Sequence, residues 1–516
     1  MEDAPVSKTT WKEVARSEEI NEGKPYVLDL SDEEQVLVFR HQGALSACGN
    51  SCTHYGAPLS DGTFTGTTVT CPFHNARFNV TSGVMLQPPA LDDLPVYDIK
   101  EENGRVYLGP VQPANITLAP GNDPRTFVVV GGGAAGQTAV ETLRRDGFVG
   151  RIVMFTAEKE HPYDRTLLSK LFLSGEKEEE ETLLRDAAFY DRLKIEVRRE
   201  TKVKTVDLAT KTVFVESGEE IHADAILLAT GSRPRVLPVP GSDLSNIFPL
   251  RSLGDARQLR NAAKDAGRAV VVGASFIGTE VAASLRAQGV EVDVVALETV
   301  PFEKVFGERI GRRFLGMHEA NGVKFHLGRR VKRFEGAGSV ERVILDDDSV
   351  LNADLVVIGV GVEPIVDYLS DSSVVADGSV QVDETLQVAP GVFAAGDIAA
   401  IPFEFGERLR VEHWAVAERH GQHAARNMLG AAHPYKLAPF FWTRQLGTSF
   451  KYVGFAGTFD KIVYHGDVEA GNFLAGYVRN GRVMAVSSVG RGDAVNRFGE
   501  MLEAGKKVSP DQLEKL

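Results

Sequence analysis

Two cysteines and two histidines occupy matching positions in two short segments near the start of the chain. His54 follows Cys52 after one residue, His74 follows Cys71 after two, and sixteen residues separate His54 from Cys71. Two thiolates and two imidazoles can hold a [2Fe–2S] cluster, with the thiolates on one iron and the imidazoles on the other. The same four side chains also suit a tetrahedral zinc ion, or they are unrelated loop residues. Their types and spacing therefore predict a metal centre and leave the metal open.

The residues around these side chains favour the iron–sulfur interpretation. Residues 52–59 read Cys-Thr-His-Tyr-Gly-Ala-Pro-Leu, and residues 71–78 read Cys-Pro-Phe-His-Asn-Ala-Arg-Phe. These segments resemble the two ligand boxes of Rieske proteins. They carry no extra cysteine of the high-potential members, so the resemblance is to low-potential, ferredoxin-type or oxygenase-associated domains. The resemblance implies four cluster ligands, Cys52, His54, Cys71 and His74. Cys48 has no place in the pattern, and we interpret it as a packing residue.

A glycine-rich turn follows an apolar run at residues 127–130. The run ends at Gly131, and Gly133 and Gly136 complete a Gly-x-Gly-x-x-Gly pattern that opens a helix. The first glycine permits a tight bend, the second lets the backbone approach a pyrophosphate, and the third lets the helix pack on the strand. Free N–H groups at the helix start then bind phosphate. This context predicts a dinucleotide site, and we interpret the dinucleotide as FAD.

The segment at residues 161–170 identifies a family. It reads His-Pro-Tyr-Asp-Arg-Thr-Leu-Leu-Ser-Lys. It resembles the Pro-Tyr-x-Arg-x-x-Leu-Ser-Lys segment of apoptosis-inducing factor and of the ferredoxin reductases that serve aromatic-ring dioxygenases. The resemblance covers nearly the whole chain and points to the Rieske-bearing branch of the apoptosis-inducing-factor-like oxidoreductases. It implies that Arg165 and Lys170 lie against the flavin.

A second dinucleotide turn lies at residues 269–278, followed by a helix expected over 279–287. Its key positions are Gly273, Ser275 and Gly278, so a serine replaces the middle glycine. A second Rossmann unit inside the first is the design with which this superfamily binds NADH or NADPH. The turn containing Gly361 then closes the NAD(P)H domain.

The same resemblance implies several further site residues. Thr230 and Gly231 match the Ala-Thr-Gly motif, and Asp397 matches the second FAD motif, whose aspartate bonds the ribityl chain. Glu280 is expected to form a partly buried pair with Lys170 at the flavin ring. An aromatic near that ring maps to Trp414. The implied catalytic residues are therefore Lys170, Glu280 and Trp414.

Two acidic residues are candidates for the ribose hydroxyls of the two dinucleotides. Glu158 follows the strand 151–155 and is the candidate for the adenosine ribose of FAD. In the NAD(P)H unit the strand 292–295 ends at Ala296 in place of the usual acid, and Glu298 stands two residues later. No arginine lies at or just after this strand end in the sequence. We therefore favour NADH over NADPH.

Composition limits the remaining classes of function. The chain has 516 residues, a net charge of −14 and a pI near 5.5, which argues against nucleic acid as a partner. It has no apolar run of membrane-spanning length and no signal-peptide character at residues 1–5, so we expect a cytoplasmic protein. All three cysteines lie in the first hundred residues. This excludes a cysteine pair beside the flavin.

These observations predict a multidomain protein. We expect an N-terminal all-β Rieske domain at 1–110, a linker at 111–124, two Rossmann-like α/β domains and a C-terminal α+β domain at 433–516. The FAD domain would be discontinuous, at 125–250 and 375–432, with the NAD(P)H domain at 251–374 between its halves.

The predicted function is transfer of electrons from NAD(P)H. Hydride is a two-electron donor, and a Rieske cluster takes one electron at a time, so the flavin must stand between them. We expect an FAD-dependent reductase that passes electrons through its own cluster to an acceptor such as a ferredoxin, a Rieske oxygenase, a cytochrome, quinone or oxygen. The alternative is a redox-sensing interaction protein with slow turnover. The acceptor and the oligomeric state stay open.

Overall fold

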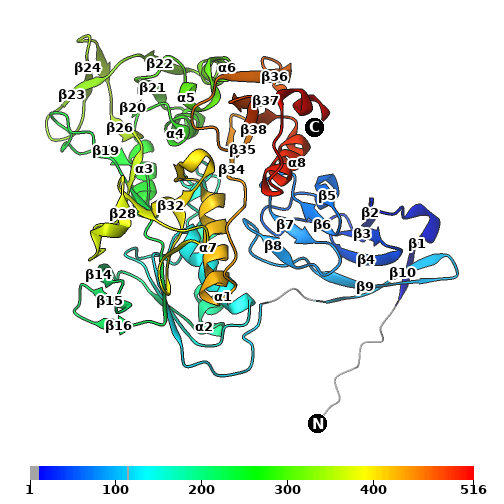
Figure 1. Ribbon diagram of the computed structural model, residues 1–516. Helices are drawn as coiled ribbons and strands as arrows, with labels where there is room; N and C mark the ends of the chain where they lie inside the picture. The colour runs from blue at the N-terminus through cyan, green and yellow to red at the C-terminus, as the bar shows by residue number, and fades with distance from the viewer. Residues whose placement is uncertain (1–10, 113–115) are drawn as a thin grey trace, which may run out of the picture. The chain divides into compact units, whose positions relative to one another are not determined.

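The computed structural model describes residues 11–112 and 116–516, so the predictions for residues 1–10 and for linker residues 113–115 lie outside the described part (Figure 1). The chain forms two compact units. Of the described residues, the first holds 11–112, 116–118, 492–506 and 515–516, and the second holds 119–491 and 507–514.

The first unit contains a six-stranded antiparallel sheet. Its strands are β1 (Lys12–Arg16), β2 (Pro25–Asp29), β3 (Gln35–His41), β4 (Ala44–Gly49), β9 (Val96–Glu102) and β10 (Arg105–Gln112). Their order across the sheet is β1-β10-β9-β4-β3-β2. The β9–β10 hairpin turns at Asn103 and Gly104, both at positive φ, as an Asn-Gly pair predicts. β10 extends two residues into the segment predicted as linker.

A second, four-stranded sheet of this unit carries the second Rieske-like segment. Its strands pair antiparallel in chain order: β5 (Thr63–Thr65), β6 (Thr68–Thr70), β7 (Arg77–Asn79) and β8 (Met85–Gln87). The second ligand segment is the connection from β6 to β7, and the first lies between β4 and β5. Helix α8 (Gly492–Glu503) comes from the C-terminal part of the chain but belongs to this unit, where it lies beside β5 (Figure 1).

The second unit contains a parallel sheet with one antiparallel edge strand. Its order is β13 (Ile195–Arg198), β12 (Arg151–Phe155), β11 (Thr126–Val130), β17 (Ala225–Leu228), β31 (Val392–Ala394) and β30 (Gln387–Ala389). Only the β30–β31 pair is antiparallel. The predicted apolar strand before the first glycine turn is therefore the central β11. Helices α1 (Ala134–Arg145) and α7 (Trp414–Met428) pack side by side in this unit (Figure 1).

A second parallel sheet of this unit follows the other dinucleotide turn. Its order is β19 (Ile247–Pro249), β26 (Leu355–Ile358), β20 (Arg268–Val272), β21 (Glu291–Ala296) and β22 (Val323–Leu327). Its helices are α3 (Leu253–Ala263), α4 (Phe276–Ala287) and α6 (Glu308–Ala320). α4 begins three residues before the predicted start because the Ser275 hydroxyl caps it, accepting from the Gly278 N–H at 3.5 Å.

The C-terminal part of the second unit is a five-stranded antiparallel sheet. Its order is β34 (Phe440–Gln445), β35 (Thr448–Gly454), β38 (Arg482–Val489), β37 (Asn472–Arg479) and β36 (Lys461–Asp467). Phe306 of α5 (Glu303–Phe306), Phe314 of α6 and Phe450 of β35 form one buried aromatic cluster. This cluster packs the C-terminal sheet against α5 and α6.

Smaller elements complete the second unit. They are α2 (Ala187–Arg192), β14 (Val203–Asp207), β15 (Thr212–Val215), β16 (Glu220–His222), β18 (Ser232–Pro234), β23 (Val331–Glu335), β24 (Arg342–Leu345), β25 (Val350–Asn352), β27 (Val362–Pro364), β28 (Val375–Ala376), β29 (Ser379–Gln381), β32 (Ala399–Pro402) and β33 (Arg408–Leu409). The 3₁₀ helices η3 (Arg165–Leu167) and η6 (Gly396–Ile398) position site residues.

The predicted fold class is confirmed: an all-β N-terminal part, two Rossmann-like sheets and a C-terminal part with its own sheet. The predicted domain boundaries stay a prediction. Among the described residues, no helix is both long and apolar enough to cross a membrane.

Candidate functional site

A cavity of about 1080 Å³ opens in the second unit. This volume exceeds the roughly 300–1,000 Å³ of ordinary small-molecule sites and suits an extended dinucleotide. Both glycine-rich turns contribute to its wall. The sequence-predicted residues that line it are Gly131, Gly133, Glu158, Arg165, Lys170, Thr230, Gly231, Ser275, Glu280, Gly361, Asp397 and Trp414. The predicted residues that are not part of its lining are Gly136, Gly273, Gly278 and Glu298.

The first glycine turn has the shape of a phosphate cradle. Gly131 has φ +122°, and a Cβ built on it would lie 2.1 Å from the Ala229 carbonyl oxygen. A Cβ on Gly136 would lie 1.9 Å from the Gly131 oxygen, so only glycine lets α1 pack on β11 here. A Cβ on Gly133 would meet nothing within 4 Å. The middle glycine therefore leaves open the space through which a pyrophosphate would approach the helix start.

The second turn repeats the close packing but not the open middle position. A Cβ on Gly273 would lie 2.3 Å from the Gly359 oxygen, and one on Gly278 would lie 2.0 Å from the Gly273 oxygen. Ser275 stands at the middle position, where its hydroxyl donates to the Gly359 carbonyl at 3.1 Å. These two glycines act in packing, whereas Ser275 itself lines the cavity.

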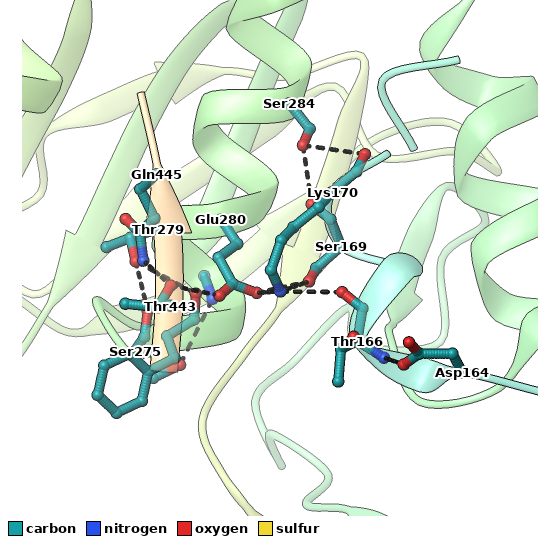
Figure 2. Close-up of polar contacts among 12 residues, drawn as sticks. Asp164, Thr166, Ser169, Lys170, Ser275, Thr279, Glu280, Ser284, Thr443 and Gln445 are labelled. Atoms are coloured by element: carbon teal, nitrogen blue, oxygen red, sulfur yellow. Dashed lines mark hydrogen bonds and ion pairs between the residues drawn. The ribbon is translucent and has the colours of Figure 1, made fainter. Parts of the chain in front are cut away.

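The predicted Lys170–Glu280 pair is brought together on the cavity wall (Figure 2). The Lys170 ammonium donates to Glu280 Oε2 at 2.7 Å and to the Thr166 carbonyl at 2.9 Å. The Ser169 hydroxyl donates to the same Oε2 at 2.6 Å, and the Thr443 hydroxyl donates to Oε1 at 2.6 Å. Glu280 is 5% exposed, so these partners replace nearly all of its water. A buried carboxylate is tolerated only with such partners.

Two partners of Glu280 were missed by sequence reasoning. Ser169 lies inside the segment that carries the family resemblance, so its neighbour Lys170 could have pointed to it. Thr443 lies on β34, 163 positions after Glu280 in the chain, and no local pattern connects the two.

Asp397 lies on η6, directly after the strand β31. Its Oδ2 accepts hydrogen bonds from the Ser232 hydroxyl at 3.0 Å and from the Arg251 guanidinium at 3.0 Å. Thr230 and Gly231 line the same part of the cavity at the end of β17. Arg251, which sequence reasoning also missed, comes from the loop before α3 and lines the cavity.

Glu158 and Arg165 form an ion pair on the cavity wall, with the Tyr163 hydroxyl donating to Glu158. Burial alone would raise the pKa of Glu158, but the Arg165 charge and the hydrogen bonds outweigh it, so this pKa is lowered. An ionised carboxylate at the end of β12 is the acceptor that ribose hydroxyls require.

Trp414 is the first residue of α7 and lines the cavity beside His413 and Phe441. The His413 ring lies 4.8 Å from the Phe441 ring, and burial lowers the pKa of His413 to about 4. Aromatic rings and a neutral imidazole therefore form this wall.

Glu298 follows the end of β21 and is half-buried. In the structure an arginine from a later part of the chain, Arg329, lies beside this strand end. The Arg329 backbone N–H donates to the Ala296 carbonyl at 3.0 Å, and its exposed side chain pairs with Asp347 at 3.0 Å. The absence of a nearby arginine, one argument for NADH, therefore holds along the sequence but not in space.

The four predicted cluster ligands lie together in the first unit. Cys52 and Cys71 are buried, and a hydrogen bond with the Cys71 thiol, together with burial, raises the pKa of Cys52. The Nδ1 atoms of His54 and His74 face each other at 3.0 Å, and both rings are half-buried. The ligands thus form one sulfur pair and one imidazole pair, the arrangement of a cluster with two ligands on each iron.

Two exposed aromatic side chains and one buried cysteine lie near the ligands. Tyr55 and Phe73 are 42% and 47% exposed beside the two imidazoles, so the histidine side faces the surface of this unit. Cys48 is fully buried in β4 and does not join the ligands, as expected for a packing residue. Among the described residues, no three His, Cys, Asp or Glu side chains gather as ligands of a single ion would.

Comparison with known families matches three parts of the chain. A model described as pyridine nucleotide-disulphide oxidoreductase matches residues 125–421, more than half of the chain. The chain belongs to the pyridine nucleotide-disulphide oxidoreductase family. A Rieske [2Fe-2S] domain model matches residues 10–98, and a reductase C-terminal model matches residues 440–515. The resemblance inferred from residues 52–78 and 161–170 is confirmed.

Individual relatives agree with this family. The chain is 36% identical over 500 residues to apoptosis-inducing factor 3 of Homo sapiens, covering 93% of this chain and 82% of that protein. It is 35% identical over 347 residues to the ferredoxin–NAD(+) reductase component of the biphenyl dioxygenase system of Paraburkholderia xenovorans, covering 67% and 85%. A solved ferredoxin reductase for the CYP199A2 system of Rhodopseudomonas palustris is 33% identical, with a TM-score of 0.72, covering 76% of this chain and 98% of that one.

This member of the family is an FAD-dependent NAD(P)H oxidoreductase of the ferredoxin reductase type with a Rieske [2Fe-2S] domain. Its own geometry fits the cofactors: the Gly131 turn leaves room for a pyrophosphate, and paired thiols and imidazoles offer the ligands of a cluster. The zinc alternative is set aside because the Rieske model matches both ligand segments.

Proposed function

We propose that this enzyme oxidises NADH and delivers single electrons, by way of FAD and its own Rieske cluster, to a protein acceptor. The observation that carries the proposal is that one cavity joins both dinucleotide turns to the buried Lys170–Glu280 pair. When bound, FAD can exchange two electrons with a nicotinamide and single electrons with an iron–sulfur cluster.

The residues of the cavity would divide the work of binding and orientation. The N–H groups after Gly131 would bind the FAD pyrophosphate, Glu158 the adenosine ribose, and Asp397 the ribityl hydroxyls. The Lys170 ammonium would stabilise negative charge that develops on the ring during reduction, with Glu280 holding that ammonium in place.

The remaining predicted residues would complete these sites. Arg165 would hold Glu158 in position, and Trp414 would pack near the flavin ring. In the first unit, Cys52 and Cys71 would hold one iron and His54 and His74 the other. The thiolate pair would then form the buried half of the site, and the imidazole pair the half-buried one.

NADH is the proposed coenzyme. Glu298 would accept hydrogen bonds from the ribose 2′-hydroxyl and repel a 2′-phosphate. The relatives from dioxygenase systems are named ferredoxin–NAD(+) reductases, which supports this assignment. Arg329, whose backbone lies beside the strand end, argues the other way, but the pairing of its side chain with Asp347 offsets its charge.

The acceptor would be a small redox protein or an oxygenase, because the dioxygenase relatives are reductases of ferredoxins. The fused Rieske domain would do the work of such a ferredoxin. We place the enzyme in the cytoplasm, where NADH is supplied.

The proposal is tested by anaerobic titration of the purified protein with NADH. We expect flavin bleaching followed by the spectrum of a reduced [2Fe–2S] cluster, and repeated turnover when cytochrome c is added. Cys71→Ala should remove the cluster, keep NADH-dependent bleaching and ferricyanide reduction, and lose most of the cytochrome c activity; His54→Ala should behave alike. Cys48→Ala is the matched control and should keep the cluster. Wild-type cytochrome c rates in the Cys71 variant would show that the cluster is not the exit, and a single slow turnover in the wild type would favour the sensor alternative.

A further inference from the structure

We propose that Thr443, Gln445 and His318 form a buried positioning relay that holds the Glu280 carboxylate in its working orientation. This inference rests on the proposed function, because it assumes that Glu280 and Lys170 act beside the flavin. None of the three relay residues lines the cavity.

The relay is a continuous line of hydrogen bonds. Thr443 Oγ1 lies 2.6 Å from Glu280 Oε1, Gln445 Nε2 lies 3.1 Å from Thr443 Oγ1, and His318 Nε2 lies 2.8 Å from Gln445 Oε1. Figure 2 shows Gln445, Thr443 and Glu280 following one another along this line, with Lys170 on the opposite side of the carboxylate. The line therefore runs from α6, through β34, to the wall of the cavity.

The donors in this line all point toward Glu280. Gln445 can donate only through its amide NH₂, so its Oε1 accepts from His318 Nε2–H, and its NH₂ donates to Thr443. The single proton of the Thr443 hydroxyl is then free to be donated to Glu280. Aligned donors polarise one another and strengthen the last bond of the line.

The reverse direction leaves a buried donor without a partner. If the Thr443 hydroxyl donated to Gln445, the Gln445 amide would have to donate to His318 Nε2, which would place the imidazole proton on Nδ1. That atom is buried and has no hydrogen-bond partner among the described residues. An unsatisfied buried donor is costly, so the structure favours the direction that ends on the carboxylate. Burial lowers the pKa of His318, which agrees with a neutral imidazole at the far end.

Burial of all three side chains indicates a purpose beyond packing. Thr443 and His318 are 0% exposed and Gln445 is 3% exposed. Apolar side chains of similar volume would fill this space without the desolvation cost of polar groups. What the polar set adds is a fixed donor opposite Lys170, so that Glu280 is held from both sides.

The relay also affects the charge that the carboxylate presents. Donor dipoles on Oε1 offset part of its negative charge, which leaves more of the Lys170 charge effective at the cavity. Without them, the wall would be more negative and would disfavour added electrons. Loss of the relay should therefore slow reduction of the flavin and shift its potential to a more negative value.

The test compares two substitutions of Thr443 in the full holoenzyme. Thr443→Val keeps the shape and removes the hydroxyl, and we expect about tenfold slower flavin reduction by NADH in stopped flow. Its flavin midpoint potential, measured by dye equilibration, should become more negative. Thr443→Ser keeps the hydroxyl and should keep most of the wild-type rate and potential. Ser487→Ala, which removes a buried hydroxyl bonded to Tyr477 in the same sheet, is the control and should change neither.

Wild-type rate and potential in Thr443→Val would overturn the relay. The same holds if Ser487→Ala lowers the rate as much, because the effect would then be general loosening of the sheet. Should Thr443→Val not fold, Gln445→Met provides the second variant, with a smaller loss expected in the same direction. Glu280→Gln distinguishes failure of the proposed function from failure of the relay. Unchanged flavin reduction in that variant contradicts the role assigned to the Lys170–Glu280 pair. Slow reduction in Glu280→Gln together with normal reduction in Thr443→Val contradicts the relay alone.

Discussion

Neutralising Glu280 or Lys170 alone should destabilise the enzyme, and neutralising both should cost less than the sum of the two single losses. In Glu280→Gln the Lys170 ammonium keeps the Thr166 carbonyl at 2.9 Å but loses its only ion-pair partner among the described residues. In Lys170→Met the carboxylate keeps Ser169 and Thr443 but stays charged in a nearly buried position. The double variant buries no unpaired charge and keeps the packing of both side chains.

The magnitude follows from the burial of the two side chains. Breaking a fully buried pair costs about 3–5 kcal/mol, and an exposed pair contributes about 0–1 kcal/mol. The side chain of Glu280 is 4% exposed and that of Lys170 is 22% exposed. We therefore expect about 2 kcal/mol for each single variant and a coupling energy of about 1–2 kcal/mol in the double-mutant cycle. If the same energy is lost from the transition state, flavin reduction slows by about 10- to 30-fold.

The assay combines denaturant unfolding of the FAD-loaded proteins with stopped-flow reduction by NADH. A matched control is the pair of Arg309 and Glu469, which has a similar N–O distance of 2.6 Å but side chains that are 46% and 65% exposed. Glu469→Gln should leave unfolding and flavin reduction nearly unchanged. Additive losses in the Lys170 and Glu280 cycle, or single variants as mild as the control, would refute the reasoning that burial makes this pair matter.

Three further predictions concern other parts of the chain. We expect a higher kcat/KM for NADH than for NADPH, and Arg329→Ala should not reduce the kcat/KM for NADH. A clear preference for NADPH that Arg329→Ala abolishes would reverse the coenzyme assignment. Burial lowers the pKa of His420 to about 3, below the 6.5 of an ordinary histidine, so the unfolded chain binds a proton first as the pH falls and stability is lost from about pH 6.5 downward. His420→Leu should make the fall in melting temperature between pH 6.5 and 4 smaller than in the wild type, and an unchanged slope would contradict this. In the first unit, Asn496 of α8 accepts from Asn75 at 2.8 Å and donates to Thr63 at 3.2 Å; Asn496→Leu should cost this unit about 1–3 kcal/mol, measured as earlier thermal loss of the cluster absorbance, with exposed Arg497→Leu as the control.

The parts of the site that could be predicted lie in short continuous segments. A glycine turn between a strand and a helix is formed by residues close in the sequence, so Gly131 and Gly136 are recognisable from neighbouring residues alone. The ligand segments around Cys52 and Cys71 are equally local. The end of α4 at Ala287 was predicted correctly, but its start was not. The predicted helix began at residue 279, whereas the capping hydroxyl of Ser275 starts the helix at Phe276.

The parts that could not be predicted depend on residues far apart in the chain. Thr443 reaches Glu280 only because β34 passes beside α4, and Arg251 reaches Asp397 across 146 positions. Arg329 reaches the end of β21 through the loop after β22. Threonine on a strand and arginine on a loop are common in any protein, so their types carry no signal. Only the tertiary packing gives them a place in the site.

Glu280 shows how these distant parts constrain one another. Its two oxygens accept from residues 169 and 170 after η3 and from Thr443 of β34, while its own backbone belongs to α4. Three segments therefore converge on one carboxylate, and a displacement of any one of them stretches hydrogen bonds made by the others. Because a buried polar group is costly when it loses a partner, the energy of this carboxylate opposes such displacements. The C-terminal sheet, which contributes neither glycine turn, thereby helps to set the geometry of the cavity in which the two dinucleotide turns meet.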